Sequence, residues 1–201
     1  MSEWWTYRLS SFLMFAPKTY WRLIELHNLD VWPAHLAALV LGLALLGLAA
    51  RRRAGAARVM AALLAPVWLW VGWSFHSQHY ATINWAAPYY ALAYAVQAVL
   101  LGLSALPRGA PAPPAGGAAP RLGWLLALSG VLLYPLAGLL AGRPWTQIEL
   151  FGITPEPTAL ATVGLLLTAR QPPGLLRGVL LIIPTLSLLV GAATLWLLVG
   201  G

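Results

Sequence analysis

Three histidines near the ends of apolar segments are the residues best suited to binding a metal ion. His76 and His79 are three positions apart, a spacing that places two side chains on the same side of a helix. His35, at the start of another apolar segment, offers a third imidazole, and imidazole is a common ligand of zinc, copper and iron. The pattern therefore predicts a metal or haem site at His35, His76 and His79. Hydrogen bonding at a membrane interface stays the alternative interpretation.

Catalytic residues are harder to find. Ser74, His76 and Asp30 contain the groups of a nucleophile, a base and an orienting acid, but no nucleophile-elbow sequence surrounds Ser74. A phosphate-binding glycine loop is also missing from the sequence. We therefore assign no catalytic residue and expect a binding protein rather than an enzyme. Arg143 and Glu149 are expected to form an ion pair within one loop.

The composition indicates that lipid surrounds most of the chain. Of 201 residues, 12 are Lys or Arg and 5 are Asp or Glu, while 60% are hydrophobic and the mean hydropathy is +0.76. Soluble domains contain roughly three times this share of charged residues. The absence of cysteine excludes a disulfide scaffold and a thiol enzyme. The formal charge of +7 comes without any nucleic-acid-binding motif, so membrane lipids and not nucleic acid are the expected partners.

The hydrophobic pattern predicts an all-α integral membrane protein. A helix needs about 20 mostly apolar residues to cross the hydrocarbon core. Residues 1–30 alternate aromatic and charged residues, which predicts an amphipathic segment at the membrane interface. Six segments then predict a six-helix transmembrane bundle: 31–50, 57–76, 84–106, 122–142, 158–169 and 178–199. The segment 158–169 is short for a crossing, and the alternatives are a start nearer Ile153 or a half-helix that its neighbours cover.

The charge distribution predicts the orientation of this bundle. If all six segments cross, the loops after the first, third and fifth contain eight arginines and no acid, whereas all five acids lie on the opposite side. Because basic residues accumulate in cytoplasmic loops, both termini are expected outside the cytoplasm. Residues 107–121 are rich in Pro, Ala and Gly and are expected to form a cytoplasmic linker. The linker connects three predicted helices in 31–106 to three in 122–201, and the two halves together form a single integral domain.

Aromatic residues concentrate on the outer side of this topology. Ten of the 11 tryptophans fall in its outer half, although interfacial aromatic residues usually occur at both membrane surfaces. The asymmetry indicates an aromatic-walled pocket or a docking surface in addition to anchoring. The candidate ligand- or partner-binding residues are Trp70, Trp73, His76, Tyr80, Asn84, Trp85 and Trp145.

Several short sequences resemble a known but uncharacterised family. They are the opening Trp4-Trp5-Thr6-Tyr7, the stretch Asn28 to Pro33, the strings Trp73 to His76 and Tyr80 to Trp85, and the segment Phe151 to Ala159. Together they resemble a family of bacterial multi-pass inner-membrane proteins that is named only as a domain of unknown function. The resemblance implies a bacterial inner membrane and one integral domain, and it brings no activity with it.

These observations favour an accessory or structural membrane protein that binds a partner or a small apolar ligand at its outer face. A small-solute transporter or channel is the first alternative, because the linker divides the predicted helices into two sets of three with opposite orientation. A metal- or haem-binding redox protein that uses His35, His76 and His79 is the second.

Overall fold

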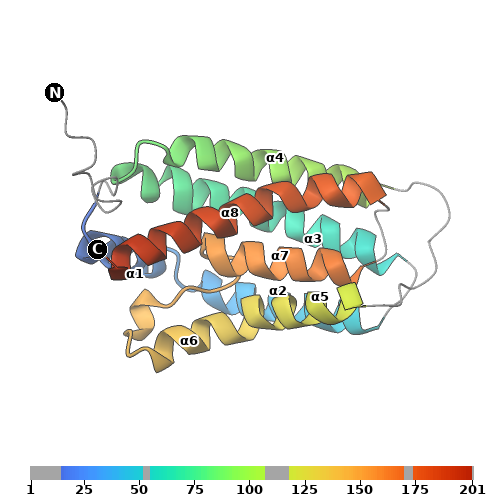
Figure 1. Ribbon diagram of the computed structural model, residues 1–201, viewed down its shortest axis with the longest axis horizontal. Helices are drawn as coiled ribbons and strands as arrows, with labels where there is room; N and C mark the ends of the chain where they lie inside the picture. The colour runs from blue at the N-terminus through green and yellow to red at the C-terminus, as the bar shows by residue number, and fades with distance from the viewer. Residues whose placement is uncertain (1–14, 52–54, 107–117, 170–173, 201) are drawn as a thin grey trace.

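The computed structural model describes residues 15–51, 55–106, 118–169 and 174–200, and every regular element in these ranges is helical (Figure 1). The start of the predicted interfacial segment and most of the predicted linker lie outside the described residues. Within 107–121, residues Ala118 onward already belong to a helix. The elements are α1 (Pro17–Asp30), α2 (Ala34–Ala50), α3 (Ala56–Val71), η3 (Gly72–Ser77), η4 (Tyr80–Thr82), α4 (Ala87–Ala105), α5 (Ala118–Leu128), η5 (Ser129–Leu133), α6 (Tyr134–Leu140), η6 (Trp145–Gln147), α7 (Pro155–Thr168) and α8 (Gly174–Gly200).

Four continuous helical segments are long and apolar enough to cross a membrane. They are Ala56–Thr82, Ala87–Ala105, Ala119–Leu140 and Gly174–Leu198, and α1 with α2 would add a fifth as one span bent by 90°. The predicted segment 158–169 corresponds to α7, whose 14 residues measure about 21 Å, against about 30 Å for the hydrocarbon core. The structure therefore confirms an all-helical chain with four to five candidate spans, and it does not confirm six.

The outer faces of these helices are apolar. Large side chains such as Val40 on α2, Leu92 on α4, Leu125 on α5 and Leu189 on α8 are exposed. Soluble monomers seldom expose so many large apolar side chains on successive helices. The distribution is compatible with a surface that faces lipid.

Helix α7 is the centre of the bundle and is buried along nearly its whole length. It packs against α5, η5 and α8, and also touches α2 and α3. Glycines permit the closest of these contacts, because a Cβ at Gly123 would lie 2.8 Å from the carbonyl oxygen of Gly164. Without side chains at these positions, the backbones of α5 and α7 approach closely enough for extended van der Waals contact.

Helix α1 covers one end of the bundle. Tyr20, Leu23, Ile24 and His27 form its buried stripe, whereas Arg22 is exposed, which confirms the amphipathic pattern. Figure 1 shows α1 beside the end at which α8 finishes, while the junction between α2 and α3 lies at the opposite end. The α1 end therefore contains the segments that precede α7 and follow α3.

Candidate functional site

A cavity of about 280 Å³ lies under α1, between α4 and α8. Its volume is close to the lower limit of typical small-molecule sites, which enclose about 300–1,000 Å³. Leu186 and Val190 line the cavity and are also exposed on the outer face of α8, so the cavity reaches the apolar surface of the bundle. The lining residues come from six elements and are Tyr20, Phe75, His76, Tyr80, Tyr90, Ala93, Tyr94, Pro155, Glu156, Ile183, Leu186, Ser187, Val190, Gly191 and Thr194.

His76 presents unpaired polar atoms in this cavity. Its side chain is only 5% exposed, and neither ring nitrogen has a hydrogen-bond partner within the protein. Aromatic rings surround it, with the centroid of Tyr94 at 4.6 Å and that of Tyr90 at 5.7 Å. Buried polar atoms in native proteins nearly always have a partner. The imidazole of His76 is therefore available to a bound molecule or to water.

Two buried carboxyl groups lie at the start of α7. Glu149 precedes the helix and Glu156 occupies its first turn, and the two carboxyl groups are close enough to interact electrostatically. Two ionised carboxylates that are buried beside each other repel, so the arrangement favours a proton on one of the two groups. Oε1 of Glu149 and Oε2 of Glu156 are buried and have no hydrogen-bond partner, which adds to the cost of ionising both groups.

Arg143 determines which carboxyl keeps the negative charge. Its Nη1 donates to Oε2 of Glu149 at 2.8 Å, which confirms the predicted ion pair. Burial raises the pKa of the Glu149 carboxyl, and the guanidinium opposes that effect. Because Arg143 stabilises the anion at Glu149, the proton of the pair belongs to Glu156, whose side chain lines the cavity.

Gly191 on α8 provides the space for Glu156. A Cβ at this position would lie 2.6 Å from both Cγ and Oε1 of Glu156. Since ordinary contacts begin near 3.4 Å, any side chain at position 191 would displace the carboxyl group. The glycine therefore allows an acidic group from α7 to pack directly against α8.

A second polar cluster fastens α1 over this end of the bundle. His27 is fully buried, and its Nε2 lies 3.0 Å from the carbonyl oxygen of Ile153, to which it donates. Asn28 donates to the carbonyl oxygens of Thr146 and Ile148 at 2.8 and 2.9 Å. These bonds attach α1, which contributes Tyr20 to the cavity lining, to the segment that leads into α7.

His79 joins this cluster through both of its ring nitrogens. Its Nδ1 lies 2.8 Å from the carbonyl oxygen of Ser74, and its Nε2 lies 2.9 Å from a carboxylate oxygen of Asp30. Nδ1 of His27 lies 3.3 Å from Nδ1 of His79. Burial lowers the pKa of His27 to about 4, in agreement with a neutral ring.

The structure brings together only part of the predicted binding set. His76 and Tyr80 line the cavity, whereas Asn84 is buried and accepts a hydrogen bond from the backbone of Ala86. The aromatic walls consist of tyrosine and phenylalanine rather than tryptophan. The four predicted tryptophans are exposed and are not among the residues that line the cavity: Trp70, Trp73, Trp85 and Trp145.

The three histidines predicted to bind metal have separate surroundings. Nε2 of His35 lies 3.3 Å from Oδ1 of Asn28. His76 lines the cavity, and His79 pairs with Asp30. Residues 72–77 form a π-helical segment and 80–82 a 3₁₀ turn, so His76 and His79 do not share one regular helical face. Within the described ranges, no group of three His, Cys, Asp or Glu side chains is placed to hold a metal ion. Metal binding by these histidines stays a prediction.

Sequence reasoning missed the acidic side of the cavity. Glu156 lies in the first turn of α7, where an acidic residue also stabilises the start of a helix. Its burial depends on α8, which is distant in sequence and contributes Gly191. The sequence signal for a buried Glu156 is its position between two prolines, at the start of a segment that is apolar but shorter than an ordinary span.

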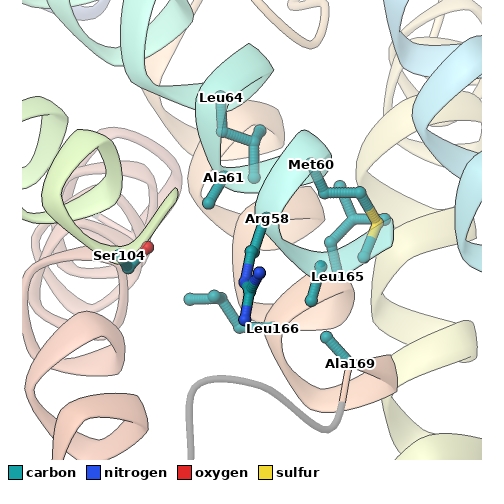
Figure 2. A pocket seen from close by; sticks show the side chains of 9 residues that line it. Arg58, Met60, Ala61, Leu64, Ser104, Leu165, Leu166 and Ala169 are labelled. Atoms are coloured by element: carbon teal, nitrogen blue, oxygen red, sulfur yellow. The ribbon is translucent and has the colours of Figure 1, made fainter. Parts of the chain in front are cut away.

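A second hollow lies near the opposite end of the bundle, between α3, α4 and α7. Figure 2 shows the side chain of Arg58 passing beside Leu166 toward Ala169. This hollow has a volume of about 10 Å³, which is room for about one water molecule. Size alone therefore makes the larger cavity the candidate functional site.

Comparison of the chain with curated proteins and with solved structures gave no match. Comparison with family profiles did, over nearly the whole length that the structure describes. The chain belongs to a family whose description is Family of unknown function (DUF6064), which matches it over residues 17–199.

Proposed function

We propose that the chain is a six-span protein of the bacterial cytoplasmic membrane, with both termini outside and α1 at the outer interface. The arrangement of charge supports this orientation. Arg51 follows α2, and the starts of α3, α5 and α8, which contain Arg58, Arg121 and Arg177, lie with it at the end of the bundle opposite α1. Asp30 ends α1, and Glu149 lies in the segment before α7. In this topology α7 is the fifth crossing, and its neighbours shield a helix too short to span the hydrocarbon alone.

The function that the site supports best is binding of a small amphipathic molecule by an accessory membrane protein. The unpaired imidazole of His76 inside an aromatic cavity is the observation that carries this proposal. An apolar ligand would leave that imidazole without a partner, at a cost of about 1–3 kcal/mol. A ligand with one polar group and an apolar body would satisfy both the ring nitrogens and the walls. Because Leu186 and Val190 connect the cavity to the outer face, such a molecule could enter from the lipid.

Native mass spectrometry of protein extracted gently from its host membrane tests this function. We expect wild-type protein to retain a noncovalent small molecule. Ala93→Trp places a large ring in the cavity wall and should remove that mass, whereas Ala192→Trp adds the same ring at an exposed position of α8 and should retain it. Equal occupancy in the wild type and both variants would contradict the proposal, as would wild-type protein that carries no small molecule.

A further inference from the structure

The chemistry of the cavity points to the charge of its ligand. We propose that the cavity binds a lipophilic organic cation in exchange for the proton on Glu156. This inference rests on the proposed function and adds to it the ligand class and a proton that leaves on binding.

The first argument is the balance of charges at the cavity wall. Among the described residues that line the cavity, Glu156 is the only acid, and none is Lys or Arg. Arg143, the nearest basic residue in this network, is already paired with Glu149 at 2.8 Å and lies over the ring of Trp21. If Glu156 loses its proton, no cation within the described lining neutralises the new charge. A positively charged ligand would supply that missing charge.

The second argument is the nature of the walls. Tyr20, Phe75, Tyr80, Tyr90 and Tyr94 contribute rings around a single carboxyl group. Aromatic faces attract organic cations through the ring quadrupole, and the attraction is strongest where water is excluded. The same rings offer no comparable attraction to an anion. His76, with both nitrogens unpaired, can additionally accept a hydrogen bond from a protonated amine.

The third argument is the proton that Glu156 holds when the cavity contains no cation. Glu149 and Glu156 are both buried, and each has a carboxyl oxygen without a hydrogen-bond partner. Two neighbouring carboxylates also repel each other, so the buried pair keeps one proton. When a cation enters, the Glu156 carboxylic acid releases this proton to solvent and the carboxylate pairs with the ligand. One proton leaves for each cation that enters, and no covalent bond changes. The total charge of the site is therefore unchanged.

The surroundings of Glu156 are consistent with this exchange. α8 contributes only the uncharged Ser187 and Thr194 to the cavity, and η3 contributes His76. The titratable or charged groups that act on Glu156 from the other packed elements are Glu149 with its partner Arg143, Tyr20, Tyr80, Tyr94 and Tyr134. Of these groups, Glu156 is the carboxylic acid that faces the cavity, and it is the group that exchanges a proton for a cation.

Isothermal titration calorimetry with a matched pair of probes tests the inference. The protein in nanodiscs is titrated with benzyltrimethylammonium, a permanent cation, and with neopentylbenzene, its neutral carbon isostere, against empty nanodiscs. We expect the cation to bind about tenfold or more tightly than the isostere, the ratio that about 1.4 kcal/mol of cation–π and ionic attraction produces. Repeating the titration in two buffers of different ionisation enthalpy should show about one proton released per cation bound.

Two variants make the result specific. Glu156→Gln preserves the shape of the side chain and should abolish both the proton release and the preference for the cation. Glu25→Gln removes an acid that pairs with Arg22 on α1, away from the cavity lining, and should change neither. Equal affinity for the two probes, or cation binding without proton release, would overturn the inference and leave the proposed function intact. If neither probe binds, the inference fails, and the mass measurement on Ala93→Trp separately decides the proposed function.

Discussion

Acidification should release α1 from the bundle through the protonation of His27. The buried ring is neutral, donates to Ile153 and presents its lone pair to His79. Burial is the main effect that opposes a charge on this ring, and the neighbouring ring of His79, with its centroid 4.7 Å away, adds to it. The folded state therefore resists protonation of His27, and its pKa falls from 6.5 to about 4.

The sign and size of the effect follow from that shift. The undocked helix binds the proton near pH 6.5 and the docked helix only near pH 4, so docking is most stable above pH 6.5 and weakens as the pH falls toward 4. At about 1.4 kcal/mol per pH unit, the loss amounts to about 3 kcal/mol. An undocked population would then increase by roughly two orders of magnitude.

Cysteine labelling can measure this opening, because the chain contains no native cysteine. Leu23→Cys places a thiol on the buried stripe of α1, and Leu29→Cys places one on its exposed face. The ratio of their reaction rates with 4,4′-dithiodipyridine cancels the intrinsic pH dependence of the thiol. We expect the ratio of buried to exposed rates to increase between pH 6.5 and 4.

His27→Gln is the control for this experiment. The amide can still donate to Ile153 but does not titrate, so its ratio should change much less over the same pH range. If the wild type and His27→Gln respond to pH equally, or if the wild-type ratio decreases on acidification, the assignment of a neutral, buried His27 is wrong.

Two further predictions concern the packing that holds the cavity in place. Gly164→Ala would bring a methyl group against the backbone nitrogen of Ala127 and should lower the free energy of unfolding in detergent by about 1–3 kcal/mol. Gly102→Ala places the methyl group in open space and should not lower it. Equal effects of the two substitutions would refute the close approach of α5 and α7. Arg143→Gln leaves the Glu149 carboxylate buried without its partner and should cost about 3–5 kcal/mol, with recovery in the double variant that adds Glu149→Gln. Additive costs in that double-mutant cycle would show that the two residues do not interact.

The local features of this chain could be predicted because neighbouring residues determine them. The amphipathic stripe of α1 follows from the spacing of Tyr20, Leu23 and His27, and the Arg143–Glu149 pair needs only a short loop. The helical segments follow from apolar runs whose backbone must satisfy its own hydrogen bonds. The composition alone restricted the protein to a class in which such helices pack together.

The cavity and its chemistry depended on contacts between residues far apart in sequence. The spacing of His76 and His79 suggested one metal site, but the π-helical segment directs His76 into the cavity and leaves His79 to pair with Asp30. Glu156 became a buried partner of Glu149 because Gly191, 35 positions later, leaves room for its carboxyl group. Sequence periodicity reports which residues share a helical face. Only the tertiary structure decides what that face meets, because burial and charge compensation arise from packing between helices.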